Sequence, residues 1–165
     1  MTAAPGELVV RVVQVHDEIA RPLFDDLARE YGTRYGGTPE QVRHELERFP
    51  AAEFEPPHGV LLLLLEEGAP VAGGAFRRFD ERTAELKRIW THPGHRRRGL
   101  GRRVLAELEE RAAQEGYGRI HLTTGPRQPE ARELYLRCGY RPLFDLDADP
   151  ESIGPLAFEK DLTAA

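Results

Sequence analysis

A continuous apolar run is the feature that most constrains the fold. It covers Val60 to Leu65 in the stretch GVLLLLLEEG, with glycines at positions 59 and 68 on either side. A strand that is apolar at every position, rather than at alternate ones, is typical of a strand covered on both faces of a sheet. The run is far shorter than the ~20 residues of a membrane-spanning helix. It therefore predicts a central strand that is buried on both sides.

Other strands and several helices surround this run. Strands are predicted over residues 7–15, 69–80, 83–92 and 119–125, and YRPLF and GPLAFEKDL are candidate closing strands. Four further stretches carry apolar residues at helical spacing.

The predicted helices begin at recognisable signals. Pro22 suits the first turn of the first helix, where a missing N–H costs little. Thr38 and Gln41 have the spacing of a capping box at the start of the second helix. The other two helices are predicted to begin at about Gly99 and at Pro129.

The order β-α-α-β-β-β-α-β-α-β-β predicts an α/β fold with a mixed, mostly antiparallel sheet flanked by helices. A length of 165 residues suits one domain over residues 1–165.

Cys138, the one cysteine, cannot form an internal disulfide and fits a reducing cytoplasm. The N-terminus lacks a basic segment followed by an apolar one, so neither a secretory signal nor a membrane segment is expected.

The charge of the chain is acidic overall but contains one basic cluster. The net charge of −5 argues against a broad basic surface for nucleic acid. Residues 96–103, however, read RRRGLGRR. A helix start leaves backbone N–H groups unpaired and carries partial positive charge, and phosphate oxygens can bind there. The two glycines have no Cβ, so a phosphate can come close to the backbone. The stretch predicts a phosphate cradle or, as the plainer alternative, a solvated basic surface.

The context on both sides of this stretch resembles a known family. The segment ELKRIWTHPGHRRRGLGRRVLAELEERA is similar to the acyl-CoA motif of the GNAT N-acetyltransferases, Arg/Gln-x-x-Gly-x-Gly/Ala, with Arg96, Gly99 and Gly101 at its fixed positions. PEARELYLRCGY resembles the family's second element, with matches at Ala131, Leu134, Tyr135, Gly139 and Tyr140. The two motifs are separated by one helix and one strand, as in the family. The resemblance covers residues 59–142 well and implies the GNAT fold.

The resemblance also implies where coenzyme A binds. Backbone amides of the motif would hold its pyrophosphate, and a backbone N–H on the strand before the motif would polarise the thioester carbonyl. Gln128 stands where many members carry an asparagine that contacts the cofactor. The implied cofactor-binding residues are Ile89, Trp90, Arg96, Arg97, Arg98, Gly99, Leu100, Gly101, Arg102 and Gln128.

Two residues are candidates for the chemistry. Tyr135 matches the family's tyrosine that protonates the leaving thiolate, although a core tyrosine would look the same in the sequence. Glu85 is the candidate general base for the acceptor amine, with an ion pair to Lys87 or Arg88 as its alternative. Strand alternation would place Glu85 and Ile89 on one face, and the bulge that the family often has here would break that pattern.

The implied function is transfer of an acetyl group from acetyl-CoA to a primary amine by direct attack in a ternary complex. A non-catalytic acyl-CoA-binding module is the alternative. No metal site is expected, because His92 and His95 lack a matching carboxylate or thiol cluster. The acceptor, a small molecule or a peptide, stays open, because its walls in the family come from the region that corresponds to residues 21–58. No nucleic-acid or membrane partner is expected, and a homodimer is compatible with the family.

Overall fold

The computed structural model describes residues 6–46 and 49–162. Within these residues, one sheet contains seven strands in the order β1-β2-β3-β4-β5-β7-β6. The strands are β1 (Leu8–Val13), β2 (Val60–Glu66), β3 (Ala69–Arg78), β4 (Thr83–Thr91), β5 (Arg119–Thr124), β6 (Arg141–Pro142) and β7 (Leu156–Asp161). The helices are α1 (Arg21–Tyr35), α2 (Pro39–Leu46), α3 (Leu100–Gln114), α4 (Pro129–Arg137) and α5 (Pro150–Ile153), with the short 3-10 helices η1 (Glu18–Ala20), η2 (Ala51–Phe54) and η3 (Pro93–His95).

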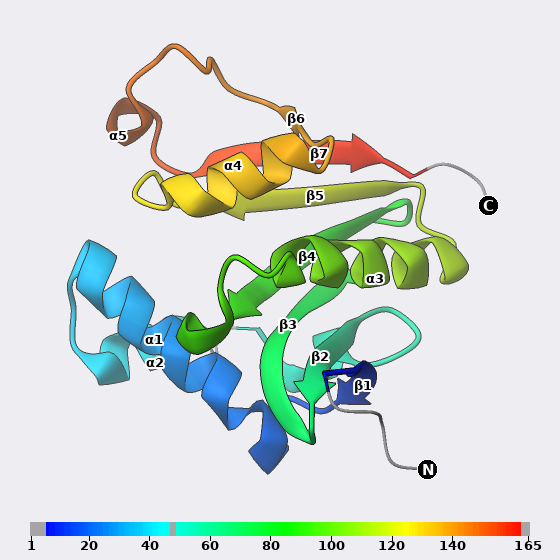
Figure 1. Cartoon of the computed structure of the whole chain (residues 1–165). Helices are drawn as coiled ribbons and strands as arrows, with labels where there is room; N and C mark the ends of the chain where they lie inside the picture. Colours follow the sequence, from blue (N-terminus) through cyan, green and yellow to red (C-terminus); the bar gives the residue numbers. More distant parts are fainter. Residues whose placement is uncertain (1–5, 47–48, 163–165) are drawn as a thin grey trace.

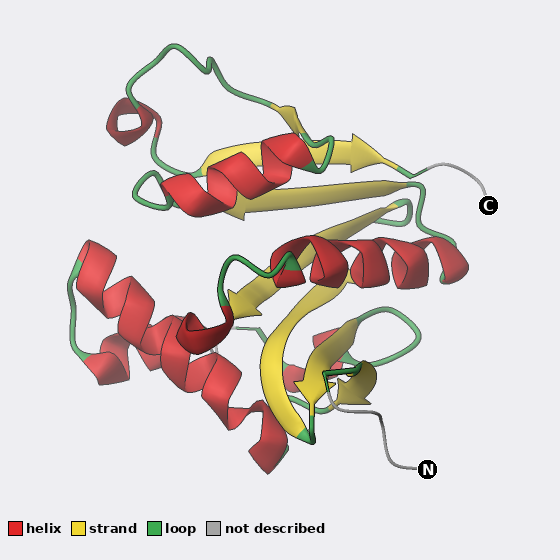
Figure 2. Ribbon diagram, in the orientation of Figure 1, coloured by secondary structure: helices red, strands yellow, loops and turns green. Residues whose placement is uncertain are grey.

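The sheet is mixed and mostly antiparallel, as the sequence predicts. β4 and β5 are parallel, whereas the other neighbouring strands pair antiparallel. Helices α3 and α4 lie over one face, and α1 lies over the other (Figures 1 and 2). No helix in the described part of the chain is long and apolar enough to cross a membrane.

The apolar run forms the centre of the sheet. Every residue from Val60 to Leu65 is at least 93% buried, which confirms the prediction of a strand covered on both faces. Leu62 and Leu64 pack in the cluster under α3 and α4, whereas Leu61 and Leu63 pack in the cluster under α1. Because side chains alternate between the two faces of the sheet along a strand, one run of leucines contributes to both cores.

Most predicted boundaries are close to the observed ones. Thr38 and Gln41 form the capping box in full: Gln41 N donates to Thr38 Oγ1 at 3.1 Å, and Thr38 N donates to Gln41 Oε1 at 2.9 Å. In the part of the chain that the structure describes, α2 ends at Leu46, and residues 47–48 lie outside the described residues. The one-turn helix α5 was not predicted, and β6, with two residues, is shorter than the predicted strand.

A bulge in β4 decides which side chains face which core. The register between β3 and β4 shifts between Gly73 and Ala75, and Arg88 has a positive φ of 61°. Ile89 therefore packs with the α3 cluster, and Trp90 packs with the α1 cluster. Regular alternation along β4 would have placed Glu85 and Ile89 on the same face of the sheet. The bulge breaks this alternation, as in the second of the two outcomes that the sequence left open.

Candidate active site

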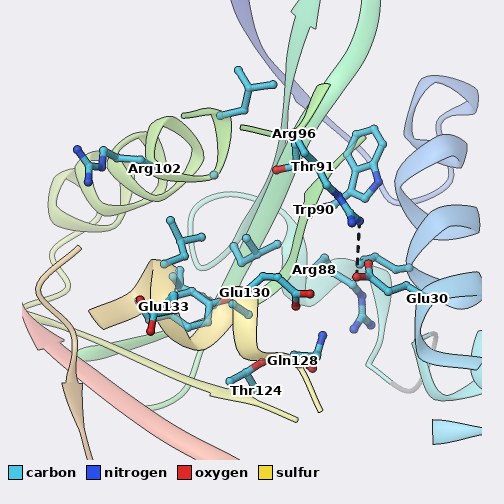
Figure 3. Close-up of a pocket in the computed structure, with 18 of the residues that line it drawn as sticks. Glu30, Arg88, Trp90, Thr91, Arg96, Arg102, Thr124, Gln128, Glu130 and Glu133 are labelled. Atoms are coloured by element: carbon cyan, nitrogen blue, oxygen red, sulfur yellow. Dashed lines mark hydrogen bonds and ion pairs between the residues drawn. The ribbon is translucent and has the colours of Figure 1, made fainter. Parts of the chain in front are cut away.

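A cavity of about 790 Å³ opens where β4 and β5 separate. The two parallel strands pair from Thr83 with Arg119 to Glu85 with His121, and beyond this point the cavity lies between them. Its walls come from α1, the second half of β4, the start of α3, the end of β5 and α4 (Figure 3). Of the residues predicted to form the site, Ile89, Trp90, Arg96, Arg97, Gly99, Leu100, Gly101, Arg102, Gln128 and Tyr135 line it.

The first turn of α3 presents unpaired backbone donors to this cavity. In the described part of the chain, no hydrogen bond is found to the N–H groups of residues 99–102, and the first helical bond runs from Arg103 N to Gly99 O. Gly99, the N-cap, has a left-handed φ of 74°, and a Cβ on Gly101 would lie 3.0 Å from Leu134 Cδ2 on α4. The glycines thus shape a helix start whose donors stay available to an anion.

The arginines before α3 divide into two groups. Arg96 and Arg97 line the cavity, and Arg96 Nη2 lies 3.6 Å from Glu30 Oε1 across it (Figure 3). The Arg98 side chain is instead held outside the cavity by a salt bridge to Glu66 on β2, and its Nη1 lies 2.7 Å from His95 Nδ1. This side chain fastens the loop to β2.

Tyr135 on α4 lines the cavity and is buried. Its ring packs 5.6 Å from that of Phe158 and 5.8 Å from that of Tyr140, and the residue is 5% exposed. No hydrogen bond is found to its hydroxyl within the described residues. Burial is the main cause that raises the pKa of Tyr135, with smaller contributions from Tyr31 and Cys138. The hydroxyl therefore keeps its proton at neutral pH.

Gln128 uses its amide oxygen inside the turn between β5 and α4. Gln128 Oε1 accepts hydrogen bonds from Gly125 N at 2.9 Å and from Thr124 Oγ1 at 3.2 Å. The residue lines the cavity, but this oxygen stabilises the turn from which α4 starts.

Glu85 lies beside the cavity rather than in its lining. Its Oε1 accepts from Arg77 Nη1 at 2.9 Å and lies 3.7 Å from Lys87 Nζ. Arg77 also donates to Glu53 Oε1 from two nitrogens, at 2.6 and 3.0 Å. The geometry favours ion pairing, as the sequence left open for Lys87, but the shorter contact is to Arg77, which the sequence did not indicate.

One cavity wall comes from α1, inside the region 21–58 that was expected to supply walls but in which the sequence marked no individual site residue. Tyr31, Glu30 and Arg34 line the cavity. Arg34 donates to Glu130 Oε2 at 2.9 Å and to Arg127 O at 2.8 Å, and its Nη2 lies 3.0 Å from Glu30 Oε1. These contacts tie the end of α1 to the start of α4. No local pattern in the sequence marks the polar residues Glu30 and Arg34 as cavity walls.

Metal-ligating side chains are not clustered in the described residues: no three His, Cys, Asp or Glu side chains lie close enough together to hold a metal ion. His92 and His95 have ring centroids 5.3 Å apart, and His92 Nδ1 accepts from Gly94 N at 2.9 Å. The pair shapes the η3 turn ahead of α3.

A mostly antiparallel sheet, one parallel pair of strands that separates at mid-length and an open helix start beside the gap together define the acyl-CoA N-acyltransferase fold. The family model for the GNAT acetyltransferases matches residues 20–140. The chain belongs to this family.

Known proteins with related sequences or structures agree with this assignment. The uncharacterized N-acetyltransferase YsnE of Bacillus subtilis is 37% identical over 93 residues, which are 53% of this chain and 62% of YsnE. The chain therefore spans less than two thirds of that relative. A Klebsiella pneumoniae protein described as an acyl-CoA N-acyltransferase superimposes with a TM-score of 0.70 and 25% identity, covering 94% of this chain and 98% of the other. The PaiA N-acetyltransferase of Thermoplasma acidophilum, solved in complex with coenzyme A, has a TM-score of 0.71 at 14% identity, with 94% and 99% covered.

Proposed function

We propose that the protein is an N-acetyltransferase that moves an acetyl group from acetyl-CoA to a primary amine by direct attack within a ternary complex. One observation carries the proposal: the first turn of α3, whose N–H groups have no partner among the described residues, and Tyr135 line the same cavity. The first can bind a diphosphate and the second can donate a proton. A cavity of about 790 Å³ is also large enough for an extended cosubstrate.

The start of α3 would hold the pyrophosphate. The N–H groups of residues 99–102 supply donors, and the partial positive charge of the helix start favours the anion. Arg96, Arg97 and Arg102 add charge-assisted contacts from the rim of the cavity. Arg98 supports this loop through Glu66 rather than through contact with phosphate.

The edge of β4 and Tyr135 would act at the thioester end of acetyl-CoA. A backbone N–H at Ile89 or Trp90 can donate to the thioester carbonyl, on which negative charge develops. Trp90 is fixed for this by its indole Nε1, which donates to Asp26 Oδ2 on α1 at 3.1 Å. When the amine attacks and the carbon–sulfur bond breaks, the Tyr135 hydroxyl transfers its proton to the departing sulfur.

The amine must lose a proton before it attacks. Because Glu85 is ion-paired and lies outside the cavity lining, we propose that this proton passes to water in the cavity, with Glu85 serving to hold β4 in place.

The cytoplasmic location and the homodimer that the sequence and the family resemblance suggest stay predictions.

Two measurements test the function. Calorimetric titration should show that acetyl-CoA binds, and a panel of primary amines should release free thiol from it. Gly99→Val should weaken the binding, because valine disfavours a left-handed φ. Binding without turnover on any amine would instead favour the non-catalytic acyl-CoA module, and no binding would overturn both.

A further inference from the structure

A second cavity of about 210 Å³ lies on the α1 side of the sheet. It is lined mainly by aliphatic and aromatic side chains from the turn after β1, from α1 and α2, from the segment around η2, and from β2 and β3. Its lining includes Val15, Phe24, Phe49, Phe54, Leu61 and Ala75. His16 and Arg88 are the polar residues of the lining that carry ionisable groups.

Two residues separate this cavity from the candidate active site. Leu46 and Arg88 line both cavities. Arg88 stands at the bulge of β4, its guanidinium donates to Leu46 O, and its Cζ lies 5.6 Å from the centre of the Phe54 ring. The two cavities therefore meet at Arg88 and Leu46, and Arg88 directly precedes the strand residues Ile89 and Trp90.

The chemistry of the lining selects an apolar guest. Apolar cavities of about 150 Å³ in proteins stay dry and take up benzene-sized molecules. An apolar group that enters a cavity lined mainly by carbon atoms gains dispersion contacts with those atoms. Here the void adjoins the place where the amine and the acyl group would meet.

We infer that the second cavity binds an apolar substituent, of about the size of a phenyl ring, carried by a substrate of the transfer reaction. The inference rests on the proposed function. The substituent can belong to the acceptor amine or to the acyl group, since both end near β4 in the proposed reaction. In either case, the cavity makes the protein selective for substrates with an apolar group close to the reacting atoms.

A comparison of substrates tests this. The first arm uses acetyl-CoA with 2-phenylethylamine or ethylamine, which have the same charge and differ in the ring. The second arm uses ethylamine with hexanoyl-CoA or acetyl-CoA. In one of the arms, we expect kcat/KM to be at least about 10-fold higher for the substrate that carries the apolar group, as is typical of a hydrophobic pocket. Equal values in both arms would overturn the inference while leaving the transferase function intact. A complete lack of turnover on all amines would overturn the function itself.

Matched variants then locate the effect. Ala75 and Ala72 are both fully buried on β3, but Ala75 lines the second cavity and Ala72 packs in the core on the other face. Ala75→Val should remove most of the preference, by about 10-fold, whereas Ala72→Val should leave it unchanged. If Ala75→Val does not fold, Phe24→Leu enlarges the same cavity and should shift the preference toward a naphthyl amine or a longer acyl chain. An unchanged preference in the folded cavity variants would overturn the assignment.

Discussion

Arg96 on the loop before α3 faces Glu30 on α1, with 3.6 Å between Nη2 and Oε1. The contact joins the two walls of the cavity at the point where phosphate is proposed to bind. Glu30 thus competes for an arginine that the cosubstrate would use.

Glu30→Gln is therefore expected to tighten acetyl-CoA binding. Removal of the carboxylate frees Arg96 and lowers the repulsion of phosphate, and partly exposed pairs of this kind correspond to about 2- to 5-fold in Kd. Calorimetry at low and high salt measures the effect, which should shrink as salt rises. Glu110→Gln, at an exposed position of α3 outside the cavity lining, removes the same charge and should leave Kd unchanged. Weaker binding in Glu30→Gln would contradict the proposed position of the phosphate.

Arg102 and Arg98 should differ in their effect on binding. Arg102 lines the cavity, so Arg102→Gln should raise the Kd of acetyl-CoA by about 5- to 20-fold through loss of a charge-assisted contact. Arg98→Gln should change Kd less than about 2-fold and should lower Tm, because it breaks the salt bridge to Glu66. Calorimetry and thermal unfolding on both variants test the contrast. The opposite ranking in Kd would show that Arg98 leaves Glu66 to reach the phosphate.

Tyr135→Phe should reduce kcat without loss of stability. The ring contacts with Phe158 and Tyr140 are kept, and no hydrogen bond to the hydroxyl is found among the described residues, so Tm should change little. Loss of a positioned acid typically lowers the rate by about 100-fold or more. Single-turnover kinetics separates this step from acetyl-CoA binding, which should be unaffected. If Tyr135→Phe has the same kcat as the wild type, Tyr135 has a structural role in the core and does not act as the acid.

Glu85→Gln should affect stability more than catalysis. The substitution removes the charge that pairs with Arg77 and Lys87, and Arg77 keeps its contacts with Glu53, so we expect a loss of about 1–2 kcal/mol in the free energy of unfolding. The pH profile of kcat/KM should keep its shape. Disappearance of its acid limb in the variant would instead identify Glu85 as the general base.

Two buried tyrosines predict a loss of stability at high pH. Burial raises the pKa of Tyr135, and burial followed by the adjacent Glu109 carboxylate raises that of Tyr140, whose hydroxyl donates to Glu109 Oε2 at 2.8 Å. Unfolded tyrosines ionise at about pH 10, so above that pH the unfolded chain has released protons that the folded chain retains. The stabilisation is full below about pH 10 and declines above it by about 1.4 kcal/mol per pH unit for each tyrosine.

Urea unfolding between about pH 9 and 11 measures this decline. Tyr140→Phe should reduce the slope by one tyrosine's contribution, while Lys160 Nζ keeps its contact with Glu109 Oε1 at 2.9 Å. An unchanged slope would show that Tyr140 does not control the alkaline transition.

The sequence predicted the architecture because its signals are local. A run of leucines, proline and glycine boundaries and the capping box at Thr38 depend on residues close together in the chain, and each agrees with the structure. The glycine–arginine stretch likewise predicted an open helix start. Where the signals weaken, as at α5 and β6, the prediction was least accurate, because short elements are set by contacts with distant segments.

The sequence by itself thus determined the order of elements, the central buried strand and the helix start with its free donors, because these follow from periodicity and from the conformational preferences of single residues. The tertiary structure decided which side chains share a cavity. It turned Arg98 toward Glu66, paired Glu85 with Arg77, brought Glu30 and Tyr31 to the wall opposite α3, and placed Arg88 between two cavities. These contacts join residues far apart in the chain, and their geometry depends on a one-residue bulge in β4 and on how the helices pack on each face of the sheet.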